Sequence, residues 1–354
     1  MLAKLIYILG TVGILLTVLP LLRFNVWWIR VWDFPRLQIF IVLALVTAGG
    51  LLAVREWHAA YLIFICFTAA CSIYQLYCIL PYTFIYPNQV EDARSADPKR
   101  GITIIASNVL LENKNSEDLL AMLSEIQPDL VLLAETDDDW IQKLEPLRKE
   151  YPYSIDHPLG NAFGIAFFSR LELIDPEIKF LIEDDIPSVH TKVRLRSGEI
   201  VRFYGLHPRP PVPTETEDST ERDAELIVVA KEIKKEKLPV IVAGDLNDAA
   251  WSRTTLLFQK ISGMLDPRIG RGFYNSFHAN YFFLRMPLDH FFHTSHFRLV
   301  ELRRERYVGS DHFPMYISLR LEDSAKSTQQ EYEANSNDRK MAEDMIDEAK
   351  EKEK

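Results

Sequence analysis

Cysteine and basic charge are both scarce in this sequence of 354 residues. The three cysteines, Cys66, Cys71 and Cys78, lie in one apolar segment, so cysteine gives no indication of redox compartment, disulfides or thiol chemistry. Lysine and arginine total 40 against 50 aspartates and glutamates, which gives a formal net charge of -10. A protein that grips nucleic acid through a broad basic face has the opposite balance, so this class is disfavoured.

Long uncharged runs, by contrast, fill much of the first hundred residues. Three runs, at about 5–22, 37–54 and 59–80, are long and apolar enough to cross a bilayer core. We therefore predict that residues 1–86 form a membrane anchor of three transmembrane helices, in an integral protein of the cell's inner or plasma membrane. The connecting stretch RFNVWWIRVWDFPR has the tryptophan and arginine mixture typical of the headgroup boundary.

The side of the membrane is predicted from the basic residues that flank these helices, because loops rich in lysine and arginine stay in the cytoplasm. More of them lie beside the first loop and the start of the polar region: Arg23, Arg30, Arg36, Arg94, Lys99 and Arg100. This favours a cytoplasmic polar region, although acidic residues lie among the last three.

The rest of the chain divides into a linker at 87–100, a folded region at 101–321 and a tail at 322–354. Within the folded region, β-rich runs such as GITIIAS, DLVLLAE and LPVIVAGD alternate with helical periodicity in SEDLLAMLSEIQ and DSTERDAELIVVAKEIKKEK. This alternation predicts a layered α/β domain. The tail is highly charged and has few bulky apolar residues, so we predict that it is solvated and disordered.

Polar residues stand where several apolar runs end, and functional residues in layered α/β proteins gather at such edges. There are eight of them: Asn108, Glu135, His207, Asp245, Asn247, Asp289, Asp311 and His312. Each has a simpler explanation on its own; the GDLND stretch, for example, fits an Asx turn and a helix cap. The ordered set is the stronger indication, and it predicts one shared site.

These side chains fit the hydrolysis of a phosphate ester. Asn108 and Glu135 offer the oxygen ligands that Mg2+ takes in proteins, usually while the ion keeps several waters. Such an ion binds a phosphoryl oxygen and offsets the charge that builds in the transition state. Asp245 suits the orientation and deprotonation of an attacking water.

The other residues fit supporting tasks. His312 becomes more basic and better oriented if a carboxylate accepts its ring proton, for which Asp289 and Asp311 are both candidates. His207 and Asn247 are candidate donors to the phosphate. The stretch HFFHTSH suggests a rival metal cluster of His290, His293 and His296, but strand alternation disfavours their convergence, so we expect neutral structural histidines.

The segments ASNV, LLAET, HPRPP, AGDLND, PLDHFF and GSDHFP occur in an order and at a spacing similar to those of the endonuclease/exonuclease/phosphatase superfamily. This superfamily contains DNase I-like nucleases, apurinic endonucleases, neutral sphingomyelinases and inositol polyphosphate phosphatases. The resemblance covers residues 101 to 320. It implies a four-layer α/β/β/α sandwich of the DNase I-like type, and metal-assisted hydrolysis of phosphate esters with Mg2+, or alternatively Mn2+.

The resemblance also implies a role for each of the eight residues. Asn108 and Glu135 would bind the ion, and Asp311 would help to hold the ion or the histidine. The other roles would be phosphate contact for His207 and Asn247, positioning of the attacking water for Asp245, and support of His312 by Asp289. Nuclease relatives often carry an acidic residue or Gln just beyond the Asn108 position, where this chain has Val109 and Leu110, so the substrate class stays open.

We therefore expect a membrane-anchored, metal-dependent phosphoesterase that hydrolyses a phosphodiester or a phosphomonoester. Its expected partners are the bilayer and a phosphate-ester substrate, either a lipid headgroup or nucleic acid; no obligate protein partner is evident. One alternative is a tethered endonuclease or exonuclease acting on DNA or RNA, with a local groove lined by Arg209, Arg253, Arg268 and Arg271. The other is a catalytically silent anchored binding module. Calcineurin-like phosphatases are excluded, because the Asp-x-His and Gly-Asn-His motifs they need are missing.

Overall fold

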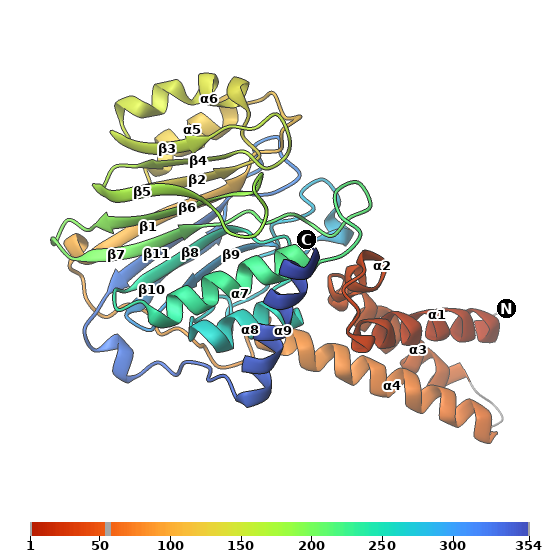
Figure 1. Ribbon diagram of the computed structural model, residues 1–354. Helices are drawn as coiled ribbons and strands as arrows, with labels where there is room; N and C mark the ends of the chain where they lie inside the picture. Colours follow the sequence, from red (N-terminus) through yellow and green to blue (C-terminus); the bar gives the residue numbers. More distant parts are fainter. Residues whose placement is uncertain (1, 54–57, 353–354) are drawn as a thin grey trace.

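Two β-sheets packed face to face make up most of the molecule in the computed structural model, which describes residues 2–53 and 58–352 (Figure 1). The first sheet has the strand order β10-β11-β1-β2-β4-β3, and the second has the order β5-β6-β7-β8-β9. The first comprises β1 (Gly101–Asn108), β2 (Leu130–Ala134), β3 (Tyr153–His157), β4 (Ile165–Ser169), β10 (Phe297–Arg304) and β11 (Met315–Leu321). The second comprises β5 (Leu173–Phe180), β6 (Pro187–Arg194), β7 (Ile200–Gly205), β8 (Val240–Asp245) and β9 (Asp289–His293).

Strand alternation explains how both faces of each sheet are buried. In β1, Ile102 and Ile104 point into the core between the sheets, where they join Phe203 of β7 and Ile241 of β8. Ile105 points the other way, into a second core beneath the outer helices. Strands buried on both faces read as continuous apolar runs, which is why β1, β2 and β8 are recognisable in the sequence.

Helices cover the outer face of each sheet. On the first sheet these are α5 (Glu117–Ile126) and α6 (Asp138–Leu144), and on the second they are α7 (Thr220–Lys235) and α8 (Arg253–Ser262). The predicted four-layer α/β/β/α sandwich is confirmed. Strands β3, β5 and β10 were not expected, because charged residues interrupt their apolar pattern.

The prediction of a disordered tail is wrong for residues 336–352. They form α9 (Ser336–Lys352), which lies across α7 and α8 (Figure 1). Ala342, Met345 and Ile346 are buried there, in the core beneath the outer helices of the second sheet. These residues recur at three- and four-residue steps, so they make an apolar stripe that the highly charged composition obscures. The tail is thus part of the fold.

The anchor helices pack together and project from one end of the sandwich (Figure 1). They are α1 (Leu2–Val18), continued by η1 (Leu19–Leu22), α3 (Arg36–Ala53), and α4 (Ala59–Ile79), continued by η3 (Leu80–Tyr82). Two spans, Ala3–Leu22 and Ala59–Tyr82, are long and apolar enough to cross a membrane. A third is possible if Trp27–Asp33 and Arg36–Leu52, which meet at 72°, count as one. The expected span at 37–54 ends at residue 54, outside the described residues.

The loop between the first two apolar helices is docked on the sandwich. It contains α2 (Trp27–Arg30) and η2 (Val31–Asp33). The Trp27 N–H donates to the Glu217 carbonyl oxygen at 2.9 Å, and the Trp251 indole donates to the Asp33 carbonyl oxygen at 2.7 Å. The linker predicted at residues 87–100 also contacts the sandwich, because the Ala93 N–H donates to the Leu299 carbonyl oxygen of β10 at 2.7 Å. Anchor and sandwich are therefore joined by contacts as well as by the chain.

Candidate active site

The predicted site residues come together at one edge of the sandwich. β1 and β2 are parallel neighbours, as are β7 and β8, so their carboxyl ends deliver polar residues to the same edge. Seven of the eight line a single cavity of about 440 Å³: Asn108, Glu135, His207, Asp245, Asn247, Asp311 and His312. The eighth, Asp289, begins β9 and is the register partner of Asp245 at the end of β8.

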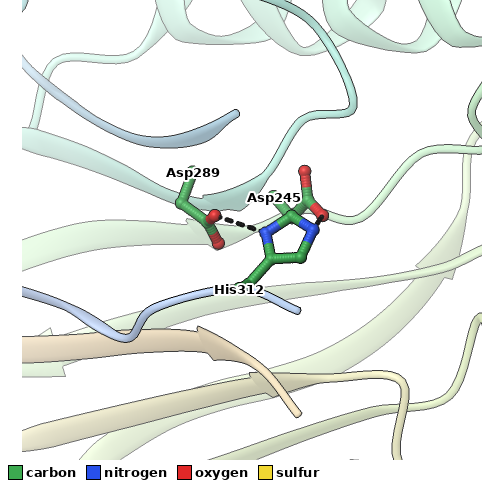
Figure 2. A group of neighbouring side chains, drawn as sticks. All are labelled: Asp245, Asp289 and His312. Carbon is green, nitrogen blue, oxygen red and sulfur yellow. Dashed lines mark hydrogen bonds and ion pairs between the residues drawn. The ribbon is translucent and has the colours of Figure 1, made fainter. Parts of the chain in front are cut away.

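His312 lies between two buried carboxylates (Figure 2). Its Nδ1 is 2.7 Å from Oδ2 of Asp289, and its Nε2 is 3.5 Å from Oδ2 of Asp245. Burial lowers the pKa of His312, but the carboxylates of Asp245, Asp289 and Asp311 outweigh burial and raise the pKa to about 10. The ring is therefore a cation at neutral pH. Of the two partners considered for His312, Asp289 makes the hydrogen bond.

A second contact group joins the ends of three strands. The side-chain N–H group of Asn108 donates to Oε1 of Glu135 at 2.6 Å and to Oδ2 of Asp245 at 3.2 Å. The Asn108 Oδ1 accepts from the Leu110 N–H. Glu135 has a φ of 64°, in the left-handed region where a non-glycine residue is strained. This conformation sets the Glu135 carboxylate beside Asn108.

Carboxylates outnumber cationic side chains at this edge, where the His312 ring supplies positive charge. Burial, reinforced by Asp289, raises the pKa of Asp245 against the effect of His312. Burial, reinforced by Glu135, also raises the pKa of Asp311. Among the described residues that line the cavity there is no lysine or arginine. Clustered oxygen donors with excess negative charge are the environment that suits a hard divalent cation.

His207 and Asn247 are in the cavity wall, but protein groups already contact both ring nitrogens of His207 and the Nδ2 of Asn247. The ring nitrogens of His207 lie 3.2 Å from the Asp245 carbonyl oxygen and 3.1 Å from the Ala162 carbonyl oxygen. Asn247 donates from Nδ2 to the Pro208 carbonyl oxygen, and its backbone N–H donates to Oδ1 of Asp245 at 2.9 Å. The GDLND stretch therefore makes the Asx turn as well as supplying site residues.

Gly244 allows the two strand ends to approach so closely. Its φ of 139° is accessible to glycine, and a Cβ there would lie 1.9 Å from the Leu206 carbonyl oxygen. A side chain at this position would push β8 away from the segment that carries His207. Glycine is therefore required for Asp245 and His207 to share one wall.

The rival histidine cluster does not form. His290 lies between Nη2 of Arg268 and the Asp248 carbonyl oxygen, and burial lowers its pKa well below the usual value. Burial likewise lowers the pKa of His293 to about 4. His296 contacts the Thr294 hydroxyl, and burial lowers its pKa too. These are neutral structural histidines, as the strand alternation indicated.

The predicted basic groove does not form either. Arg209 pairs with Glu183 and Asp185, and Arg271 pairs with Asp92. Arg268 is buried against Asp266, and Arg253 bonds to the Asn25 side chain and the Arg23 carbonyl oxygen in the anchor loop. Each of the four guanidinium groups is engaged in a local contact of its own.

Sequence reasoning missed the apolar walls of the cavity. Trp32 and Phe34 come from the anchor loop, Phe163 from the segment before β4, and Phe277 and Met286 from the segment before β9. Each wall residue approaches the strand ends only through the fold. One signal was available, because the aspartate and the arginines in RFNVWWIRVWDFPR must find buried partners if that stretch is packed.

A buried ion-pair network supports both the anchor loop and the site. Nη1 of Arg30 is 2.9 Å from Oδ2 of Asp33, and its Nη2 is 3.7 Å and 3.8 Å from carboxylate oxygens of Asp248 and Asp223. Arg222 pairs with Asp223 at 2.6 Å and donates to the Asn247 carbonyl oxygen. The anchor loop is thus linked through charges to the turn that carries Asn247.

Three comparisons place this chain among known proteins. The model of the Endonuclease/Exonuclease/phosphatase family matches residues 105–312, more than half of the chain. A UPF0294 protein of Vibrio campbellii is 26% identical over 136 residues, which cover 38% of this chain and 45% of that relative. The match thus spans less than half of the length of this curated relative.

Solved structures share the fold at low sequence identity. A humanized D. rerio TDP2 with 14 mutations has a TM-score of 0.53 and 19% identity, covering 63% of this chain and 100% of that one. The human Nocturnin catalytic domain with bound sulfate has a TM-score of 0.51 and 16% identity, covering 63% and 94%. The family match and the shared fold lead to one conclusion. The chain belongs to the endonuclease/exonuclease/phosphatase family.

Proposed function

We propose that this protein is a membrane-anchored, divalent-metal-dependent phosphoesterase that hydrolyses a phosphodiester or a phosphomonoester by attack of water. The observation that carries the proposal is the cavity in which Glu135, Asp245 and Asp311 face the imidazolium of His312. The carboxylate oxygens can bind a divalent cation, and the positively charged ring of His312 can stabilise the negative charge of a phosphate. The apolar helices would hold the enzyme in a cell membrane, with the catalytic domain predicted to be cytoplasmic.

Glu135 and Asn108 are the proposed ligands of Mg2+, for which Mn2+ is the alternative, with Asp311 as a further ligand or a support. The Asn108 Nδ2 group lies 2.6 Å from Oε1 of Glu135, and the Asn108 oxygen that would bind the ion now accepts from the Leu110 N–H. When bound, the ion would polarise the phosphoryl group and offset its growing negative charge. Asp245, Asp289 and His312 also offer ligand atoms within 4.8 Å of one another. Because both ring nitrogens of His312 face carboxylates, we assign that group to proton handling.

The remaining residues would act on the water and the phosphate. Asp245, buried and with a raised pKa, would orient the attacking water and take its proton. His312, oriented by Asp289, would donate to the phosphate and stabilise its charge. His207 and Asn247 would contact the phosphate after giving up or sharing their present carbonyl partners.

The test uses the full chain in detergent, with a soluble chromogenic diester and a soluble chromogenic monoester as substrates. We expect turnover of at least one of them, its loss on treatment with a chelator, and its return with Mg2+ or Mn2+. Asp245→Asn should lower kcat by about 100-fold or more. Turnover that survives chelation would contradict the metal assignment. Binding of phosphate esters without any turnover would favour the silent binding module.

A further inference from the structure

The catalytic cavity has a polar floor and apolar walls. Its wall residues include Trp32, Phe34, Phe163, Pro211, Phe277 and Leu284. Proteins that bind nucleic acid neutralise backbone phosphates with lysine and arginine, and the described lining has neither. Apolar walls gain binding energy only from apolar surface on a ligand. The cavity therefore fits a substrate that carries a hydrocarbon portion next to its phosphate.

One wall belongs to the anchor. Trp32 and Phe34 lie between η1, which ends at Leu22, and α3, which begins at Arg36. If the flanking helices lie in the bilayer, this loop is at the bilayer surface, where tryptophan is commonly found. Trp28 in the same loop is 50% exposed, so a large aromatic face is available to lipid there. The part of the cavity wall that Trp32 and Phe34 form would therefore lie at the bilayer surface.

A second apolar element lies beside the first turn of α3, next to the anchor loop. Phe282 and Phe283, in η6 (Phe282–Leu284), are 79% and 56% exposed. Nε2 of Gln38, in the first turn of α3, donates to the Phe283 carbonyl oxygen at 3.0 Å. Exposed aromatic clusters of this kind usually mark a contact surface. Leu284 both adjoins this cluster and lines the cavity, which makes the apolar surface continuous from the membrane level to the site.

We propose that the substrate is a lipid phosphate ester of the surrounding bilayer. Its phosphate would occupy the polar floor, its first chain carbons would lie against Trp32, Phe34 and Leu284, and Phe282 and Phe283 would enter the headgroup layer. This inference rests on the proposed function and names its substrate class. In the reaction, the water oxygen bonds to phosphorus, the ester P–O bond breaks, and the leaving oxygen ends with a proton, so an alcohol and a phosphate product form.

The experiment compares matched substrates with and without acyl chains. Full-length protein is reconstituted in nanodiscs and given phosphatidylglycerol, phosphatidic acid, their deacylated forms glycerophosphoglycerol and glycerol phosphate, a soluble chromogenic diester, and a single-stranded DNA oligonucleotide. We expect kcat/KM for one acylated lipid to exceed that for its deacylated form by about tenfold or more, because the chain contributes binding energy. The variant Phe282→Ser/Phe283→Ser should lower lipid turnover by about tenfold and leave the soluble diester within about twofold.

Tyr153→Ser is the matched control. Tyr153 is also aromatic and 40% exposed, but it begins β3 opposite Ser169, at the far end of the sheet from Glu135. Its replacement should leave both activities unchanged. Equal turnover of acylated and deacylated substrates, or faster cleavage of DNA, would overturn the lipid inference while the phosphoesterase proposal stands. Equal loss of lipid and soluble-diester turnover in the double variant would also overturn it. An absence of turnover on every substrate would overturn both proposals.

Discussion

His312 depends on Asp289 for its orientation, and the carboxylates of Asp245 and Asp289 together keep the ring charged. The Nδ1 to Oδ2 distance is 2.7 Å, and Oδ1 of Asp289 has no hydrogen-bond partner among the described residues, so the carboxylate is committed to this ring. Asp311, the other candidate, lies within its electrostatic reach, but no hydrogen bond joins it to the ring in the described structure. A carboxylate partner that fixes a catalytic histidine is a recurring arrangement.

We expect Asp289→Asn to lower kcat on a soluble ester by about 100-fold, with a smaller effect on KM, because the neutral amide no longer stabilises the imidazolium. Steady-state kinetics of the full chain in detergent provide the measurement, and Asp92→Asn, on the surface, is the control. A kcat within about threefold of the unmodified protein would show that the pair does not contribute to the chemistry.

Glu225 makes the stability of the fold fall as pH rises. It is buried on α7, and burial, aided by Glu183, raises its pKa to about 8. Its ordinary pKa in an unfolded chain is about 4.3. Between these values the folded state binds more protons than the unfolded state, so stability falls as pH rises from about 4.3 through 8. The full contribution is present only below the lower pKa.

Glu225→Gln should remove this penalty. We expect the variant to match the unmodified protein near pH 5 and to be more stable near pH 9 by on the order of 2 kcal/mol. Chemical unfolding in detergent at both pH values measures the difference. Glu232→Gln, on the same helix but partly exposed, should show no comparable pH dependence. A stability gain that is equal at both pH values would contradict the titration of Glu225.

At the scale of elements, α2 is attached to the sandwich by charge. Arg30 is buried among Asp33, Asp223 and Asp248. We expect Arg30→Met to lower the free energy of unfolding by about 3 kcal/mol, because it leaves buried carboxylates without their partner. It should also lower activity, since the Trp32 wall loses its support. Arg94→Met is the control: Arg94 is 65% exposed in its pair with Glu91, so its loss should cost less than about 1 kcal/mol.

Unfolding in detergent, followed by tryptophan fluorescence, compares the two variants. Equal stability of Arg30→Met and Arg94→Met would mean that the buried network does not hold the anchor loop.

Two arginines used to predict a cytoplasmic domain, Arg30 and Arg36, are engaged in this network or with Asp33. They face carboxylates instead of lipid headgroups, so they carry less weight in that prediction.

Elements differed in how well the sequence predicted them. β1 and β8 are short apolar runs that end in Asn108 and Asp245, and Glu135 directly follows β2. Both the strands and the site edge could therefore be predicted locally. α9 could not be, because its apolar stripe is diluted by charge and becomes stable only against α7 and α8. The cavity walls could not be either, because Trp32 and Pro211 meet only in the folded chain.

At the scale of the whole molecule, the N-terminal segment completes the wall of the cavity in the sandwich. The chain from residue 87 onward would lack Trp32, Phe34 and Arg30, which provide a cavity wall and a buried positive charge. We expect that fragment to be unstable or to lose at least about 100-fold in kcat/KM even on a soluble ester. Comparison with the full chain in the same detergent is the measurement. Full activity of the fragment would show that the anchor only tethers the enzyme.

Because the anchor loop docks on the sandwich, the N-terminal helices cannot simply be exchanged for a foreign membrane helix. A foreign transmembrane helix joined to residue 87 would restore attachment to a bilayer but would supply neither the guanidinium between Asp223 and Asp248 nor the Trp32 face. Chimeras would therefore need to carry residues 23–36 along with the helices, and natural variation in that loop should be matched by variation around Asp223.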